Sequence, residues 1–143
     1  MNTGHWETQK ALSPDSKYGF IYRITFLLTG QKYVGKKAYY AYNRTGSKKV
    51  KESNWRDYTG SSIDLNALIR YYGKDWFHFE IITECCTKSC WSYMESNILH
   101  KWDVLTLRDD KWAERVYLNK AINKIQWIPK HCAAVIQINN DQT

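Results

Sequence analysis

Two short motifs near the start of the chain carry tyrosine hydroxyls that could act on one substrate atom. They are Phe20-Ile21-Tyr22 and Tyr33-Val34-Gly35, and their tyrosines are eleven residues apart. The residues between them are mostly aromatic, aliphatic or β-branched, and Thr29-Gly30 predicts a turn because glycine adopts positive φ at no steric cost. In a β-hairpin over residues 18–35 the two tyrosines lie near the same end of adjacent strands. Strand tyrosines usually serve packing alone, so the rest of the chain must decide their role.

A glutamate on an apolar helix face is the second residue that could do chemistry. Residues 88–103 predict a helix that Ser89 could cap, and Glu95 falls on its core-facing side. A carboxylate there is costly unless it is paired or binds a cation. Glu95 is therefore one half of a buried salt bridge, a residue at the edge of the apolar face, or a metal ligand or acid–base group in a cleft. The apolar residues that share its face are Trp91, Met94, Ile98, Leu99 and Trp102.

The elements that must position these residues are only partly clear from the sequence. Residues 63–72 predict a helix that Ser61 or Ser62 caps and Gly73 ends, and residues 76–83 predict a largely buried strand. Residues 37–44 are compatible with a short helix, and residues 44–56 form a basic loop with interleaved aromatic residues. We expect one domain over residues 1–143: a core of about 18–125, a flexible lead-in over 1–17, and a tail over 126–143 that we leave unassigned.

Composition narrows the partners. The chain has 143 residues, 43% of them hydrophobic, which is enough for one domain with its own core. The 21 Lys and Arg residues exceed the 14 Asp and Glu residues, and a net charge of +7 favours DNA or RNA over an anionic membrane. Because no run of about 18 apolar residues and no signal peptide is visible, we expect a cytoplasmic protein that does not bind membranes.

The four cysteines fit a reducing compartment. Their spacing is not that of a zinc ribbon, so we interpret the thiols as small buried hydrophobes. A zinc site built from Cys132, His131 and His100 is the alternative.

Taken together, these motifs resemble those of the GIY-YIG nuclease superfamily, and in particular its small phage-encoded, homing-type members. The resemblance covers about residues 18–125: the two tyrosine motifs, Tyr58-Thr-Gly-Ser-Ser62 before a helix, Glu95 and Asn119. It implies an α/β (α+β) fold with a small three-stranded antiparallel sheet flanked by helices. Phe20 stands where the family has its first glycine. The family also has a catalytic arginine on the helix after its second motif, for which Arg44 is our candidate; Lys36, Lys37 and Arg56 are alternatives.

The resemblance implies a Mg²⁺-dependent endonuclease that cuts double-stranded DNA, with Mn²⁺ able to substitute. Tyr22 would be the general base, Tyr33 its hydrogen-bonding support, and Glu95 the metal ligand; His78 is another candidate base. Arg44 and Lys36 would contact phosphate, and Asn119 would complete the site. A homodimer would allow double-strand cleavage. The alternative is an inactive DNA- or RNA-binding module on the same fold. Expected DNA contacts are Lys37, Lys48, Lys49, Lys51, Trp55 and Arg56, and Lys120, Lys124 and Lys130 are additional candidates. Tyr39, Tyr40, Tyr42 and Trp55 could stack on bases or pack in the core.

Overall fold

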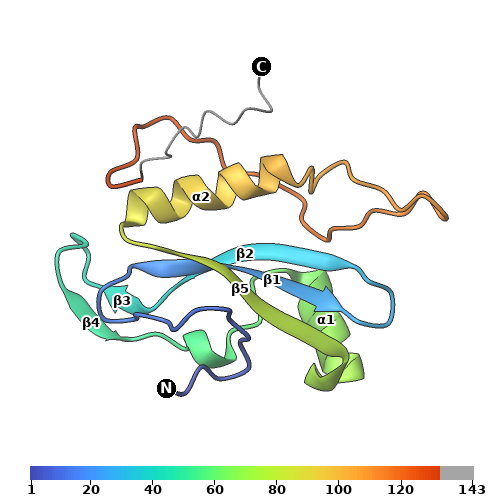
Figure 1. Cartoon of the computed structure of the whole chain (residues 1–143), viewed down its shortest axis with the longest axis horizontal. Helices are drawn as coiled ribbons and strands as arrows, with labels where there is room; N and C mark the ends of the chain where they lie inside the picture. The colour runs from blue at the N-terminus through green and yellow to red at the C-terminus, as the bar shows by residue number, and fades with distance from the viewer. Residues whose placement is uncertain (133–143) are drawn as a thin grey trace.

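A computed structural model describes residues 1–132 of the chain, and Figure 1 shows its arrangement. A mixed α+β fold is built from a three-stranded sheet, a separate two-stranded hairpin and two helices. In chain order the elements are β1 (Gly19–Phe26), β2 (Lys32–Ala38), β3 (Tyr40–Tyr42), β4 (Lys49–Glu52), a 3₁₀ turn (Trp55–Asp57), α1 (Ile63–Tyr72), a second 3₁₀ turn (Lys74–Trp76), β5 (Phe77–Cys85) and α2 (Lys88–Lys101). The predicted fold class is confirmed.

The main sheet is antiparallel, in the order β2-β1-β5, so β2 is an edge strand. The predicted hairpin is confirmed as β1 and β2, and Gly30 takes a φ of 79° in its turn. Tyr22 pairs with Gly35, and Ile24 pairs with Tyr33. Tyr22 and Tyr33 therefore share one face of the sheet, and their ring centroids are 6.3 Å apart.

The two helices cover opposite faces of this sheet (Figure 1). Helix α1 has the predicted bounds, and the Ser62 hydroxyl accepts a hydrogen bond from the Leu65 N–H as its N-cap. Helix α2 begins after Thr87, whose hydroxyl caps the Cys90 N–H, rather than at Ser89. Its apolar side packs on the sheet as predicted, with Trp91, Met94, Ile98, Leu99 and Trp102 in one cluster.

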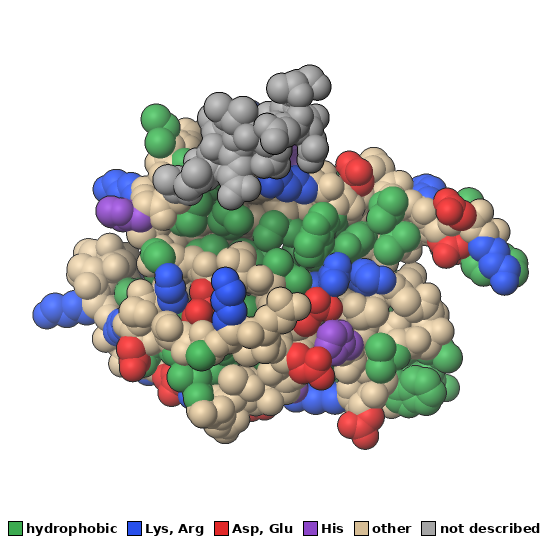
Figure 2. Space-filling model, viewed as in Figure 1, with side chains coloured by type: hydrophobic (Ala, Val, Ile, Leu, Met, Phe, Trp, Pro, Cys, Tyr) green, Lys and Arg blue, Asp and Glu red, His purple; other side chains and the backbone are tan. Residues whose placement is uncertain are grey.

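The segment after β2 is a second hairpin, and the predicted helix over 37–44 is wrong. Strands β3 and β4 pair antiparallel, and the turn between them is held by the Asn43 side chain, which accepts hydrogen bonds from the Ser47 and Lys48 N–H groups. Gly46 takes a φ of 76° there. An Asn side chain that satisfies backbone donors locally competes with helix formation. Lys and Arg side chains project at the left of the view, where β3 and β4 lie (Figure 1 and Figure 2).

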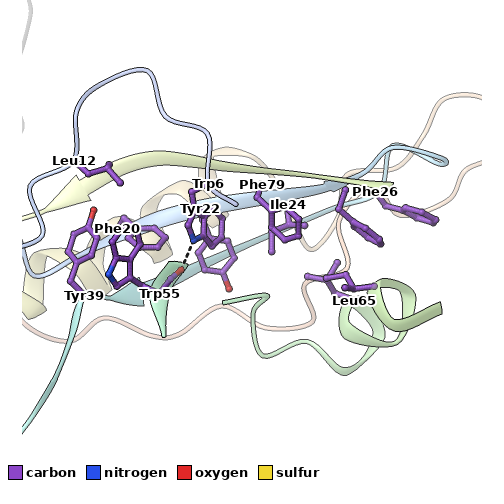
Figure 3. Packing of buried hydrophobic residues seen from close by; sticks show 12 residues of the cluster. Trp6, Leu12, Phe20, Tyr22, Ile24, Phe26, Tyr39, Trp55, Leu65 and Phe79 are labelled. Atoms are coloured by element: carbon purple, nitrogen blue, oxygen red, sulfur yellow. Dashed lines mark hydrogen bonds between the residues drawn. The ribbon is translucent and has the colours of Figure 1, made fainter. Parts of the chain in front are cut away.

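The core below the sheet is largely aromatic (Figure 3). Trp55 is fully buried in it and Trp6, from the expected flexible lead-in, is only 3% exposed. The Trp6 indole donates to the Trp55 carbonyl, and Glu7 pairs with β5 through two backbone hydrogen bonds. The lead-in therefore packs on the domain. Trp55 fills the core and is not available for DNA stacking, which corrects our expectation.

The cysteines also depart from expectation. Cys90 and Cys132 are joined in a disulfide across 42 residues, Cys86 is exposed, and Cys85 is a buried free thiol. Our interpretation of four reduced, buried thiols is therefore wrong for three of them. The remainder of the unassigned tail, residues 133–143, lies outside the described residues. Within residues 1–132, no helix has the length and apolar character needed to cross a membrane.

Candidate active site

A pocket of about 570 Å³ opens at the outer edge of β2, between the start of α1 and the middle of α2. It brings together four of the residues that the sequence singled out, from β1, β2 and α2: Tyr22, Tyr33, Lys36 and Glu95. Asn119 and Lys120, from the segment after α2, complete one wall. Residues 70 or more positions apart in the chain thus face a common space.

Tyr22 reaches the pocket because β2 has a glycine opposite it. Its side chain is 1% exposed, and a Cβ atom built on Gly35 would lie 2.3 Å from the Tyr22 hydroxyl oxygen. Gly60, with a φ of 84°, makes room on the other side. Within residues 1–132, the Tyr22 hydroxyl makes no hydrogen bond, so it is free to bind a water or a substrate oxygen. Burial, followed by the nearby Tyr33, Tyr58 and Glu95, raises the pKa of Tyr22 well above its ordinary value.

We predict that Gly35→Ala destabilises the fold through Tyr22. The added methyl group overlaps the phenol ring, and overpacking of this kind costs about 3 kcal/mol. Urea denaturation should show the loss in the wild-type background and little further loss in a Tyr22→Ala background, because the ring is then absent. Equal losses in the two backgrounds would contradict this role for the glycine.

Glu95 and Lys36 form the charged part of the pocket. The Glu95 side chain is 13% exposed, and its Oε1 lies 3.9 Å from the Lys36 Nζ, at the limit of an ion pair. Lys36 also donates to the Ser92 hydroxyl at 2.9 Å and lies over the Trp91 ring. Burial raises the pKa of Glu95, against the opposing effect of Lys36, and burial lowers the pKa of Lys36. The attraction between the two charges therefore does not offset the cost of burying either of them.

The surroundings of Glu95 suit a hard divalent cation. Its carboxylate accepts no hydrogen bond within the described part of the chain, and it faces a pocket wide enough for the waters that Mg²⁺ retains. Among residues 1–132, no group of three or more His, Cys, Asp or Glu side chains could hold a metal. A cation would therefore rest on one carboxylate and its own waters.

The mouth of the pocket is formed by two further tyrosines. The Tyr33 hydroxyl lies 3.4 Å from the Ser61 Oγ. Tyr58 lines the pocket with its ring 6.1 Å from that of Tyr22, and the Lys37 Nζ lies 4.1 Å from its centroid. The sequence identified Tyr58 only as part of a motif before a helix. Its position two residues before Gly60, which packs against Tyr22, was the signal that could have placed it in the site.

His5 contacts the backbone of Tyr58, and we predict that its protonation makes the fold sensitive to acid. Its Nε2 lies 2.9 Å from the Tyr58 carbonyl, and its ring stacks on Phe79. Burial, then Lys74, lowers the pKa of His5 from 6.5 to about 4. The unfolded chain therefore takes up this proton more readily, so stability is complete above pH 6.5 and is lost as the pH falls toward 4. After allowance for the exposed part of the ring, the loss is about 1 to 2 kcal/mol.

Urea midpoints across this pH range, compared with those of His5→Phe, check the prediction. Phenylalanine keeps the stacking but cannot be protonated, so the variant curve should be flatter. Parallel curves would show that the acid sensitivity comes from other groups.

Asn119 has a structural contact that explains its burial. Its side-chain oxygen accepts from the Val34 N–H at 3.0 Å, and its amide donates to the Val34 carbonyl at 2.8 Å. Both bonds lie on the edge of β2 that faces away from β1, between Tyr33 and Gly35, and residues 116–118 pair with the same edge at Lys32. In this structure Asn119 acts on the backbone of the tyrosine motif, and we interpret it as a positioning residue.

The other predicted contacts lie elsewhere. Arg44 is exposed at the tip of the β3–β4 hairpin and is not among the pocket-lining residues; Lys48, Lys49 and Lys51 are exposed on the same hairpin. Arg56 is paired with Glu52 and stacks on Trp55. His78 lies beside Glu7 and Glu80 in a separate cleft. Tyr39 is buried, and Tyr40 and Tyr42 pack against residues 15–18. The structure thus places Lys36, and not Arg44, beside Glu95.

The comparison with protein families agrees with this geometry. Residues 5–122 match the family described as "Putative endonuclease segE, GIY-YIG domain". Because this match spans most of the 143 residues, the chain belongs to this GIY-YIG family. The resemblance inferred from the tyrosine motifs is thereby confirmed. No curated protein and no solved structure matched the chain.

Proposed function

We propose that the chain is a metal-dependent endonuclease that hydrolyses phosphodiester bonds in DNA. The observation that carries this proposal is one pocket that joins a tyrosine hydroxyl with no hydrogen-bond partner among residues 1–132, a partly buried lysine and a largely buried carboxylate. Membership of an endonuclease family and the net charge of +7 support the same substrate.

The charged residues have separable roles. Lys36 offers a cation to a non-bridging phosphate oxygen, and burial lowers its pKa, so a bound phosphate would favour its charged form. Ser92 and Trp91 hold the lysine in place. Glu95 would hold Mg²⁺, or Mn²⁺ in its place, and the metal supplies charge stabilisation for the phosphate and the leaving 3′ oxygen.

Tyr22 orients the attacking water and would take its proton while its own phenolic proton passes to a non-bridging phosphate oxygen of the substrate. A phenol has a pKa of about 10 in water, and burial raises the pKa of Tyr22 further. In the pocket without a bound metal, the group is therefore protonated before reaction. Tyr33, at the mouth of the pocket, supports the same water or the adjacent phosphate through its hydroxyl.

One pocket of this kind cuts one strand at a time. A double-strand break would require two copies of the chain or a second encounter with the same duplex, so a transient homodimer on DNA belongs to the proposal. Expected products are nicked DNA first and linear DNA later.

A non-catalytic DNA- or RNA-binding module is the alternative, favoured by one observation. Within residues 1–132, no arginine lines the pocket, so the phosphate would meet only lysine. A binding module, however, gains nothing from the burial of Glu95.

Supercoiled plasmid incubated with the protein and Mg²⁺, Mn²⁺ or EDTA tests the proposal. Conversion to nicked and then linear DNA with either metal, and none with EDTA, is the expected result. Stable complexes with intact plasmid at every metal concentration would instead establish the binding module.

A further inference from the structure

The strongest unexplained feature of the surface is the basic β3–β4 hairpin. We propose that this hairpin, residues 40–52, is an arm that enters the major groove of B-form DNA next to the pocket. This inference rests on the proposed DNA substrate. It adds the surface that grips the duplex and the kind of duplex that fits it.

The charge of the arm is unpaired. Arg44, Lys48 and Lys51 are all exposed, and within residues 1–132 their side chains make no ion pair or hydrogen bond. The arm has one acidic residue, Glu52, and Arg56 neutralises it. Three uncompensated cations within eight residues give the arm a strongly positive surface. Such a surface binds a polyanion without any competing internal partner.

The arm is also rigid before any ligand binds. Tyr42 stacks on Tyr18 at 5.1 Å, and the Tyr40 hydroxyl donates to Asp15 at 2.9 Å. Lys49 donates to the Asp15 carbonyl and lies over the Tyr40 ring. The Asn43 side chain fixes the turn. A surface that is already ordered loses little conformational entropy on binding, which distinguishes this arm from a solvated charged loop.

Residues on either side of the arm in the sequence line the pocket. The chain leaves the pocket at Lys36, forms the arm, and returns to the pocket at Tyr58. A four-residue strand such as β4 spans about 13 Å, which is roughly four nucleotides along one strand of DNA at 3.4 Å each. A duplex whose phosphate lies in the pocket would thus continue along the arm.

The shape of the arm selects the ligand. The major groove of B-form DNA admits a two-stranded β-ribbon, whereas the major groove of A-form RNA is too deep and narrow for side chains to enter. The arm therefore fits duplex DNA and not duplex RNA.

A matched pair of triple variants tests the arm. The first is Arg44→Gln, Lys48→Gln and Lys51→Gln; the control is Arg70→Gln, Lys74→Gln and Lys101→Gln, which removes the same charge from exposed residues outside the arm and the pocket. Binding to a labelled duplex is measured by fluorescence anisotropy in EDTA over a range of salt, so the result does not depend on cleavage. Thermal unfolding checks that all three proteins are folded.

The arm variant should bind duplex DNA at least about tenfold more weakly at 0.1 M salt, with the slope of log Kd against log salt reduced by about 2 to 3. The control variant should change the Kd and the salt slope much less. Bulky substituents at C5 of the pyrimidines fill the major groove, so they should weaken the wild type and leave the arm variant nearly unaffected.

Equal losses of affinity for duplex DNA in the two variants would contradict this role for the arm. An arm variant that loses as much affinity for duplex RNA as for duplex DNA of the same sequence would contradict it too. So would a wild type that is indifferent to the C5 substituents. If the arm result holds while plasmid stays intact with metal, the DNA-binding surface stands and the endonuclease proposal fails.

Discussion

Replacement of Glu95 by glutamine should abolish cleavage and leave DNA binding almost intact. Glutamine has the same shape but lacks the charge that would hold a divalent cation, and loss of metal-based charge stabilisation costs at least about 10³-fold in rate. Single-turnover cleavage of a labelled duplex measures the rate, and anisotropy in EDTA measures Kd. The cations of the arm are untouched, so Kd should change by less than about threefold.

Stability gives this prediction a second readout. Burial raises the pKa of Glu95 above its value in the unfolded chain, so the ionised carboxylate weakens the fold at neutral pH. Glu95→Gln should therefore unfold at the same temperature as the wild type or higher. A variant that loses activity and also melts earlier would indicate a structural salt bridge with Lys36 rather than a metal ligand.

Removal of the Tyr22 hydroxyl should be almost as damaging to activity. Tyr22→Phe keeps the ring that packs on Gly35 but removes the group that orients the water, and loss of proton-transfer assistance costs at least about 10²-fold. The hydroxyl has no hydrogen-bond partner within residues 1–132, so its removal should not lower the unfolding free energy. Single-turnover rates and urea denaturation measure the two effects.

Tyr39→Phe is the matched control, because Tyr39 is also buried in the sheet core. Its hydroxyl donates to Glu84 at 2.7 Å and is outside the pocket. This variant should lose about 2 kcal/mol of stability, as expected for a hydrogen bond to a charged group, and keep its cleavage rate. If Tyr22→Phe and Tyr39→Phe behave alike, Tyr22 has no special role.

The sequence predicted the parts of the site that depend on local patterns. A nearly continuous run of aromatic, aliphatic and β-branched residues followed by Thr29-Gly30 defined the first hairpin, and the 3.6-residue period of α2 placed Glu95 on its apolar side. Both signals act within one element, so they were independent of the distant contacts. The hairpin itself predicted that Tyr22 and Tyr33 lie close together, and the addition of Glu95 to the same site followed from the family resemblance.

The sequence did not reveal features set by contacts between distant segments. Trp55 sits in a basic, polar stretch, and its contacts with Trp6, Phe20 and Tyr39, all distant in the sequence, show that it belongs to the core. Residues 37–44 have no strong helix breaker before Asn43, so the pairing of β3 with β4 was hidden. Arg44 was assigned to the site on the assumption of a helix over residues 37–44. Because these residues form a hairpin instead, Arg44 lies at its exposed tip and outside the pocket. The disulfide joins Cys90 to a cysteine 42 residues away, and no local pattern predicts it.

The most direct test of the central claim is to locate the metal. Mn²⁺ is paramagnetic and broadens NMR signals near its binding site. Trp91 lines the pocket one helical turn from Glu95, and its indole N–H, which donates to the Phe20 carbonyl at 3.3 Å, offers such a signal. A Trp91→Phe spectrum assigns that signal. We predict that Mn²⁺ broadens it in the wild type and not in Glu95→Gln. Broadening that persists in the variant, or a sharp signal at Mn²⁺ concentrations that support cleavage, would contradict a metal-dependent nuclease site at the edge of β2.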